Sequence, residues 1–376
     1  MKFKVKKDVL IEKLQPVAKV INSRHTIPVL TGILVDVGYE EIHLTGSDTN
    51  QMVQVVITRD PEKPAFTVET PGKGVFPAKY FLELMKKLSG EEIEIEAEGL
   101  RIEIRSGRTN VHLQILSADD YPPAPFINES HIVNLKIGDL IKAFQKTKDF
   151  VGNGGTRPIL QGVNVIITND RIVYCATDSH RMSRYVHKWQ CDKEVSQLSI
   201  VVPTKGLDVL SQFEENCDVK VVFDDKKIGI ISDGMKFFSW LLEGMYPDTS
   251  RIVPQKYVAE YVLHREELAK AVDRALLFAK ETKNNAVRLT FRGQEVTLKV
   301  DTEVGAVQEG VFAESYDGND GEELTIGVNG RYLLEGLRVF DGSKIRVGLS
   351  GNVSPIVLSE PDNPNNIHLI LPLRLG

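Results

Sequence analysis

The densest group of residues that could do chemistry is the run Asp178-Ser179-His180. An acid, a hydroxyl nucleophile and an imidazole base are the residue types of acyl-transfer catalysis. Consecutive residues of an extended chain point to alternate sides, so these three cannot form a hydrogen-bonded relay among themselves. The run therefore does not indicate a hydrolase.

Other patterns of catalysis and metal binding are missing from the sequence. The segment Gly152-Asn-Gly-Gly155 is glycine-rich, but the Gly-Lys-Ser/Thr of a phosphate loop does not follow it. There is no Gly-x-Ser-x-Gly elbow, and the eight histidines include no His-x-x-x-His pair. Related acidic turns at Asp48, Asp178 and Asp301 favour a role in the fold. We predict a protein that is not an enzyme and binds neither metal nor cofactor.

These turns belong to a threefold repeat. Amphipathic segments begin at positions 76, 202 and 328 and alternating strands at 93, 219 and 345, so both recur every 126 residues. A period this long indicates repeated domains rather than a solenoid. Proline-rich linkers lie at 121–125 and 246–254. We predict an α+β protein of three similar domains, residues 1–127, 128–254 and 255–376.

Each domain is expected to pack two helices on β-sheets. Apolar residues recurring three and four apart place the helices at 6–24, 77–89, 136–152, 203–216, 264–283 and 329–340. Pro16 falls inside the first helix, where it should kink the helix or end its first half.

The charge is distributed unevenly between the helices and the rest. The chain has 46 Lys+Arg against 52 Asp+Glu, a formal charge of −6, which excludes a simple polycation. The six helical segments hold 20 Lys+Arg and 13 Asp+Glu, so they are net +7 and the remainder is −13. A basic helical layer would suit a surface that faces nucleic acid. The alternative is that lysine simply favours exposed helical faces.

Cysteine usage and hydropathy indicate the compartment. Cys175, Cys191 and Cys217 have no metal-ligand spacing and cannot all pair, so we expect free thiols in a reducing compartment. The N-terminus lacks a signal peptide's apolar run, and no stretch is apolar enough to span a bilayer. We predict a cytoplasmic protein.

Periodicity selects the basic residues that would face nucleic acid. Lys142 and Lys146 lie four apart, away from the apolar stripe of their helix. The other candidates, at helix ends, are Arg24, Lys79 and Lys205. Phosphate contacts carry no sequence information, and no groove-reading motif accompanies them. Binding to DNA should be independent of sequence and sensitive to salt, which disfavours a sequence-specific regulator.

Five stretches in this order resemble the bacterial DNA polymerase III β subunit family, the sliding clamps, in its Bacillus-type branch. They are Ser23-Arg-His-Thr-Ile-Pro-Val-Leu-Thr-Gly32, Thr156-Arg-Pro-Ile-Leu-Gln-Gly162, Ala176-Thr-Asp-Ser-His-Arg181, Tyr246-Pro-Asp-Thr249 and Leu371-Pro-Leu-Arg-Leu375. The resemblance runs over essentially the full length.

The resemblance implies a DNA clamp fold and a head-to-tail homodimer, a ring of six domains lined by twelve helices. Double-stranded DNA passes through such a ring, which tethers the replicative polymerase by topology and has no catalytic site of its own. Heterologous contacts of this kind close when the rotation suits a ring. A clamp paralogue that serves repair or a secondary polymerase is the alternative.

The resemblance also implies a dimer contact. An edge strand with Arg108, Val111 and Leu113 would meet the partner's helix residues. On this chain those helix residues are Arg274, Leu277 and Phe278. The alternative is that Leu277 and Phe278 are core residues of an amphipathic helix.

A second implied surface is a pocket between the second and third domains that receives short peptides from the polymerase alpha subunit, the clamp loader and other clamp-motif proteins. Aliphatic walls would hold apolar anchors and arginines would fix polar groups. Its residues, carried over by motif, are Arg157, Leu160, Thr177, Ser179, Arg181, Met182, Pro247, Arg251, Ile252, Asn329, Tyr332, Val353, Pro355, Leu369, Leu371, Leu373 and Arg374. The alternative for the C-terminal segment is an ordinary final strand.

Two features depart from the family's pattern. Gly376 extends the chain one residue past the usual terminus, and Met182-Ser183 is slightly more polar than usual. Both would retune which peptides bind best.

Overall fold

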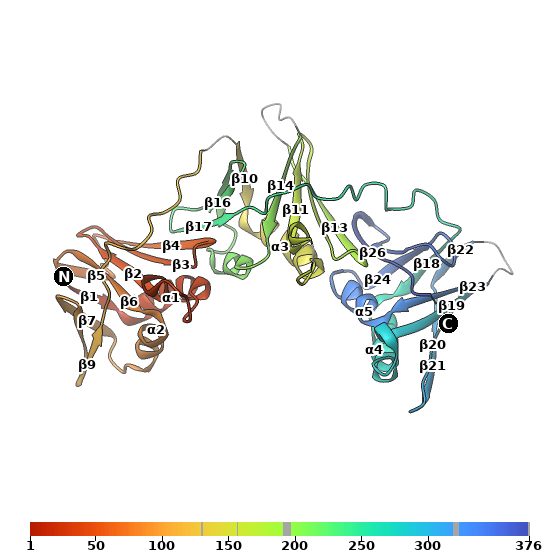
Figure 1. Cartoon of the computed structure of the whole chain (residues 1–376), viewed down its shortest axis with the longest axis horizontal. Helices are drawn as coiled ribbons and strands as arrows, with labels where there is room; N and C mark the ends of the chain where they lie inside the picture. Colours follow the sequence, from red (N-terminus) through yellow and green to blue (C-terminus); the bar gives the residue numbers. More distant parts are fainter. Residues whose placement is uncertain (129–130, 156, 191–196, 319–322, 375–376) are drawn as a thin grey trace. The chain divides into compact units, whose positions relative to one another are not determined.

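A computed structural model describes residues 1–128, 131–155, 157–190, 197–318 and 323–374 (Figure 1). Cys191 and Gly376 lie outside these ranges. The backbone contacts divide the chain into two compact units. Unit 1 comprises Met1–Ile141 and Lys205–Leu241, and unit 2 comprises Lys142–Thr204 and Leu242–Gly376.

The three repeats contain similar successions of strands and helices, with a short 3-10 helix in place of the second α-helix in the described part of the central repeat. The first repeat consists of β1 (Lys2–Lys6), α1 (Lys7–Val20), η1 (Pro28–Thr31), β2 (Gly32–Val37), β3 (Glu41–Ser47), β4 (Gln51–Thr58), β5 (Phe66–Thr70), β6 (Gly72–Pro77), α2 (Ala78–Lys87), β7 (Glu92–Glu98), β8 (Arg101–Ser106) and β9 (Thr109–Gln114). The central repeat consists of β10 (His131–Lys136), α3 (Ile137–Thr147), η2 (Lys148–Phe150), η3 (Pro158–Gln161), β11 (Gly162–Ile167), β12 (Arg171–Thr177), β13 (Arg181–Lys188), β14 (Leu198–Pro203), η4 (Leu207–Gln212), β15 (Asp218–Phe223), β16 (Lys227–Ile231) and β17 (Met235–Trp240).

The third repeat consists of β18 (Ala259–His264), α4 (Arg265–Ala279), η5 (Lys283–Asn285), β19 (Ala286–Arg292), β20 (Glu295–Asp301), β21 (Ala306–Phe312), β22 (Ser315–Gly318), β23 (Glu323–Asn329), α5 (Gly330–Arg338), β24 (Lys344–Leu349), β25 (Ile356–Glu360) and β26 (Asn363–Ile370).

Neighbouring repeats share sheets. In unit 1 the strand orders are β5-β1-β7-β8-β9 and β10-β15-β16-β17-β4-β3-β2-β6. In unit 2 they are β14-β11-β12-β13-β26-β25-β24-β18-β22 and β21-β20-β19-β23. The last strand of one repeat therefore pairs with the fourth strand of the preceding repeat, β17 with β4 and β26 with β13. This sharing is why the two units divide the central repeat between them.

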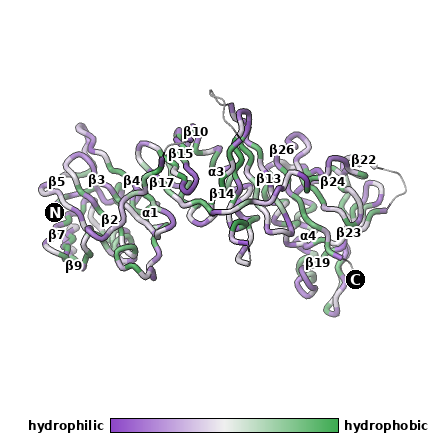
Figure 2. Tube along the Cα trace, turned by 45° about the horizontal axis from the view of Figure 1, so that its top comes forward, coloured by the Kyte–Doolittle hydropathy of each residue, from purple (hydrophilic) through white to green (hydrophobic). Residues whose placement is uncertain are grey.

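The helices pack against the sheets with their apolar faces. Helix α1 buries Leu10, Leu14 and Val17, which are three and four residues apart, against α2, β3 and β4. In unit 2, α4 likewise lies beside α5 and packs on β20 and β21 (Figure 1). Hydrophobic and hydrophilic residues alternate along many strands, as half-buried sheets require (Figure 2). No helix in the described ranges is long and apolar enough to cross a membrane.

Two expectations about helices were wrong. Pro16 does not end the first half of helix α1, which continues to Val20, because Pro16 itself is buried together with Val17 and Val20 and this packing offsets the lost hydrogen bond. The helix expected at 203–216 is the short 3-10 helix η4, preceded by Gly206 in the left-handed conformation (φ 81°). The described ranges therefore hold five α-helices, not the six that a twelve-helix ring requires.

The acidic turn also recurs in two repeats rather than three. Asp48 Oδ1 accepts hydrogen bonds from the backbone of Asn50 and Gln51 at 3.1 and 3.0 Å. Asp301 instead ends β20 and pairs with Lys299 at 3.0 Å. The turn of the third repeat is closed by Thr302, whose hydroxyl donates to the carbonyl of Gly305 at 2.7 Å.

We predict opposite effects of two helix substitutions. In Gly336→Ala the new methyl group overlaps the imidazole ring of His368, which is fully buried. The free energy of unfolding should fall by about 1–3 kcal/mol despite alanine's better helix propensity. Gly138→Ala, on an exposed turn of α3 with nothing near the new methyl, should be neutral or stabilising by up to about 1 kcal/mol. Urea melts of both variants measure this, and equal effects would contradict the packing described.

Candidate functional site

The candidate site lies where β13 of the central repeat pairs with β26 of the third, and Met182 is paired with Leu369 there. We call this place the unit 2 junction. The turn that enters β13 is held by one carboxylate. Asp178 Oδ1 accepts hydrogen bonds from the backbone N–H groups of His180 and Arg181 at 2.9 and 3.0 Å. Ser179, at the tip of the turn, has a left-handed backbone (φ 75°). The Asp178 carboxylate thus shapes a turn, and the run Asp178-Ser179-His180 forms no catalytic relay.

Arg181 is the charged centre of this junction. Its side chain is only 8% exposed, and Nε donates to Asp178 Oδ2 at 2.9 Å. Nη1 pairs with Glu335 of α5, and the guanidinium lies 4.3 Å from the ring centre of Tyr332 and 4.9 Å from that of Phe150. A buried cation with acceptors and aromatic faces around it is held in one place. The turn of the central repeat is thereby fixed to α5 of the third.

The partners of Arg181 are positioned in turn. Asn329 caps α5, its side-chain oxygen accepting from the N–H groups of Arg331 and Tyr332 at 3.0 and 3.3 Å. Burial is the largest influence on Glu335 and raises its pKa, but Arg331 and Arg181 together lower the pKa below its usual value. Glu335 is therefore an anion between two cations.

The C-terminal segment crosses from one repeat to the next. After β26 ends at Ile370, the Leu371 N–H donates to the His180 carbonyl at 2.9 Å, and Leu373 N–H donates to Gly327 at 2.7 Å. The segment is therefore not a simple continuation of the final strand. It lies beside the turn of β13 and then beside β23.

The predicted pocket residues fall into a buried set and an exposed set. Leu160, Thr177, Arg181, Met182, Asn329 and Leu369 are buried, and Tyr332, Pro355 and Leu373 are half-buried. Arg157, Ser179, Pro247, Arg251, Ile252, Val353, Leu371 and Arg374 are exposed. Val353 is 89% exposed, Ile252 41% and Leu371 37%, so these aliphatic side chains face solvent.

Four predicted basic residues are accessible and one is not. Arg24 lies four residues after the end of α1, and Lys79 and Lys142 are exposed on α2 and α3. Lys205 is 68% exposed, and its ammonium contacts Asp48 Oδ2 at 2.5 Å.

The expectation that Lys146 lies on an exposed face was wrong. Its side chain is 8% exposed, and its ammonium donates to Asp341 Oδ1 at 2.5 Å and to the carbonyl of Val339. Helical spacing placed Lys146 off the apolar stripe, but the loop after α5 covers it. Burial, the largest influence, raises the pKa of Asp341, yet the ammonium groups of Lys146 and Lys142 together lower it.

The predicted dimer residues lie on or beside edge strand β9 and on helix α4, which packs against edge strand β21. Val111 and Leu113 are half-buried on β9, the edge strand of the five-stranded sheet. Leu277 of α4 is 67% exposed, and so is not a core residue, whereas Phe278 packs against the core of the third repeat. Arg274 makes a two-pronged ion pair with Glu309 of edge strand β21 at 2.6 and 2.7 Å. Arg108 is exposed in the turn before β9.

Three residues of the junction were missed by sequence reasoning. The rings of Phe150 and His368 meet at a tilt of 56° with their centres 4.5 Å apart. The Arg181 guanidinium lies over the Phe150 ring and acts electrostatically on His368. Glu335 could have been found from its spacing, because it lies four residues after Arg331 on one helix. Phe150 and His368 carry no such signal, since their partners lie far away in the sequence. In the described part of the chain, no three His, Cys, Asp or Glu residues lie close enough to hold a metal ion.

The fold and this junction define a class, a clamp of three α+β domains that share sheets through their last strands. Family models of the DNA polymerase III beta subunit match all three, the N-terminal domain over residues 1–125, the central domain over 134–248 and the C-terminal domain over 250–374. The chain belongs to the DNA polymerase III beta subunit family, the beta sliding clamps. It is an accessory processivity factor of DNA replication and not an enzyme.

Relatives and solved structures agree over whole chains. The beta sliding clamp of Bacillus subtilis (strain 168) is 35% identical over 381 residues, with 100% of both chains covered. That of Halalkalibacterium halodurans is also 35% identical, over 384 residues and 100% of both. The crystal structure of the Bacillus subtilis clamp has a TM-score of 0.94, and that of a Pseudomonas aeruginosa clamp bound to griselimycin has 0.92 at 26% identity, each with 100% of both chains covered. Assembly into a ring is known for this family.

We predict that His368 makes stability depend on pH. Burial, the larger cause, and the nearby Arg181 cation lower the pKa of His368 from 6.5 to about 3. Below pH 6.5 the His368 imidazole binds a proton in the unfolded chain but not in the folded chain. The free energy of unfolding therefore decreases as the pH is lowered, by about 1.4 kcal/mol per pH unit. Between pH 7.5 and 5.0, His368→Leu should therefore lose about 2 kcal/mol less than the parent chain. Urea melts measure this, with the exposed His180→Leu as control, and equal losses in all three proteins would contradict it.

We predict unequal roles for two lysines on one helix. Lys146→Met leaves the Val339 carbonyl without its donor, while Asp341 keeps its contact with Lys142, and should lower the free energy of unfolding by about 1–3 kcal/mol. Lys142→Met removes a contact of 3.3 Å from a side chain that is 51% exposed, and should change stability by less than about 1 kcal/mol. Thermal or urea melts distinguish them, and equal effects would show that Lys146 is not buried in solution.

Proposed function

We propose that two copies of this chain pair head to tail, β9 of one copy against β21 of the other, and close six repeats around double-stranded DNA. One observation carries this proposal. β9 is the last strand of its repeat and β21 the fourth strand of its own, and in unit 1 and unit 2 the equivalent strands pair as β17 with β4 and β26 with β13. Pairing β9 with β21 would complete the same pattern a third time.

The side chains near these edges support the proposal. Leu277 offers an exposed apolar anchor near β21, and Val111 and Leu113 offer half-buried apolar side chains on β9. The Arg274–Glu309 ion pair holds β21 to α4. Heterologous contacts of this type form closed rings when the rotation per subunit suits.

We propose that Arg24, Lys79, Lys142 and Lys205 approach DNA phosphates, while Lys146 has a structural role. Four exposed cations on or near helices would give weak binding that is independent of sequence. Retention on DNA would then depend on ring closure, which suits a chain whose formal charge is −6. We propose that the protein works in the cytoplasm, where it would meet the chromosome.

We propose that the unit 2 junction receives short peptides from the replicative polymerase alpha subunit, the clamp loader and other clamp-motif proteins. Exposed Ile252, Val353 and Leu371 supply aliphatic contacts, and Arg157, Arg251 and Arg374 supply cations for polar groups. With the proposed domain boundaries near residues 127 and 254, this junction would lie between the second and third domains.

The decisive experiment is retention on DNA after loading. The protein is incubated with its cognate clamp loader, ATP and nicked circular DNA, and half the sample is then linearised. A closed ring should resist salt on circles and be lost from linear DNA, whereas equal retention on both would mean contact binding. Retention on neither would favour a paralogue that uses another loader.

A matched pair of variants tests the proposed interface in the same assay. Leu277→Glu introduces a charge at a side chain that is 67% exposed, so the chain should fold but lose pairing and retention. Tyr39→Glu, at a side chain that is 58% exposed in the turn before β3, should behave as the parent chain. Unchanged dimer mass in Leu277→Glu would place the contact elsewhere.

A further inference from the structure

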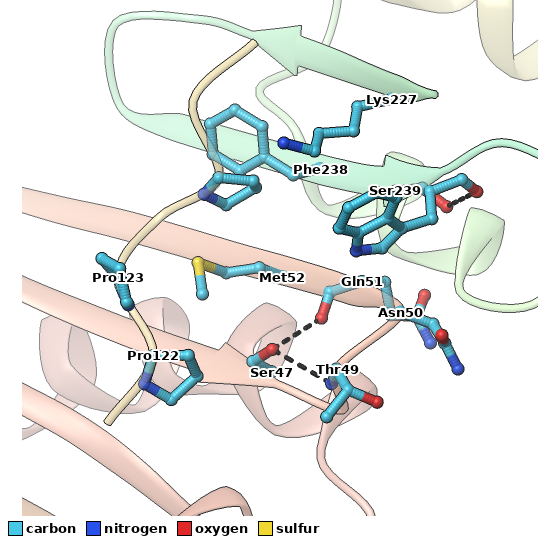
Figure 3. A pocket seen from close by; sticks show the side chains of 12 residues that line it. Ser47, Thr49, Asn50, Gln51, Met52, Pro122, Pro123, Lys227, Phe238 and Ser239 are labelled. Atoms are coloured by element: carbon cyan, nitrogen blue, oxygen red, sulfur yellow. Dashed lines mark hydrogen bonds between the residues drawn. The ribbon is translucent and has the colours of Figure 1, made fainter. Parts of the chain in front are cut away.

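Unit 1 contains a cavity of about 280 Å³ at the junction of β4 and β17 (Figure 3). Its apolar lining comes from three segments: β4 supplies Met52, β17 supplies Phe238 and Trp240, and the linker supplies Pro122 and Pro123. In Figure 3, Met52 faces the linker prolines across the cavity. Its size is just below the range of small-molecule sites, so it has room for one or two side chains.

The backbone around this cavity repeats that of the unit 2 junction. Met52 faces Phe238 across β4 and β17, as Met182 faces Leu369 across β13 and β26. The residue two positions after Phe238 or Leu369 donates its backbone N–H to the turn in both places. Trp240 donates to the Asn50 carbonyl at 2.9 Å, and Leu371 donates to the His180 carbonyl at 2.9 Å.

The turns correspond as well. Asp48 and Asp178 each accept two backbone N–H groups, and Thr49 and Ser179 each have φ of 75°. The cavity therefore occupies the place in unit 1 that the proposed peptide site occupies in unit 2.

The side chains around the two turns differ in charge. Arg181 is replaced by Gln51, whose amide donates to Asp48 Oδ2 at 3.1 Å where Arg181 donates to Asp178 Oδ2 at 2.9 Å. The buried cation of unit 2 is thus absent from this position, and the apolar contact surface is larger because Phe238 and Trp240 replace two leucines.

The polar chemistry of the cavity selects an acidic partner. Among the described residues that line it, Lys227 is a cation and none is an acid. The Lys227 ammonium lies 4.8 Å from the Trp240 ring centre, and the Trp240 side chain is 43% exposed. A peptide with an aromatic or leucine side chain next to a carboxylate would contact the Trp240 ring and the Lys227 ammonium at the same time.

We propose that this cavity is a second peptide-binding site, which takes a short linear segment of another protein with an apolar anchor next to an acidic residue. The inference goes beyond the proposed function, which places peptide binding only in unit 2. Each chain would then hold two peptides of related chemistry, one at each internal junction.

The test uses a fluorescein-labelled peptide, Ser-Asp-Leu-Phe-Gly, titrated into the full-length protein by calorimetry and fluorescence anisotropy. The proposal expects two sites per chain. Trp240→Ala should abolish one site and leave the other, and Leu371→Ala, which alters the equivalent residue of unit 2, should do the reverse. Lys227→Met should weaken only the unit 1 site, by about tenfold, since it removes a charge-assisted contact.

Photo-cross-linking keeps the test independent of variant folding. A probe with benzoylphenylalanine in place of phenylalanine should label residues 47–52 or 238–240 of the parent chain. A single site that survives Trp240→Ala, or labelling confined to unit 2, would overturn the second site and leave the proposed function intact. Two sites that both survive Leu371→Ala would instead overturn the assignment in unit 2. A changed oligomeric state of Trp240→Ala with unchanged peptide binding would mean that the cavity contacts a second copy of the chain, which also overturns the proposal.

Discussion

The structure depends on one hydrogen-bonding constraint, that the last strand of a repeat finds its outer partner in the repeat before it. An unpaired edge strand exposes a row of backbone donors and acceptors, and pairing with a neighbouring repeat satisfies them. β17 on β4 and β26 on β13 do so within the chain. The shared sheets and the two compact units both follow from this pairing.

Two junctions with one backbone have diverged in their side chains. In unit 2, Arg181 is enclosed by Asp178, Glu335 and two rings, so the site has a charged, rigid centre with aliphatic residues at its surface. In unit 1, Gln51 takes its place and an aromatic pair lines a cavity. The duplicated backbone supplies position and register, and local substitutions supply the chemistry.

The sequence predicted what depends on local pattern. The repeat and five of the six expected helices follow from apolar periodicity. The turns at Asp48 and Asp178 follow from carboxylates that accept hydrogen bonds from backbone groups a few positions away in the sequence. Sharing of sheets could not be predicted, because a strand's pattern does not identify its neighbour. The burial of Lys146 involves Asp341, 195 residues away, and the contact between the rings of Phe150 and His368 likewise joins residues far apart in the sequence. The prediction of an α-helix at 203–216 was wrong because a single glycine, Gly206, starts the segment in a left-handed conformation.

The free edges β9 and β21 have a kinetic consequence for the proposed pair. Each copy presents one edge of each kind, so a closed pair holds two identical contacts between the same two molecules. When one contact opens, the other keeps the separated edges at a high effective concentration, and reclosure outpaces escape. A modest contact can therefore give a long-lived assembly, and opening at a single contact would admit DNA without separating the two copies.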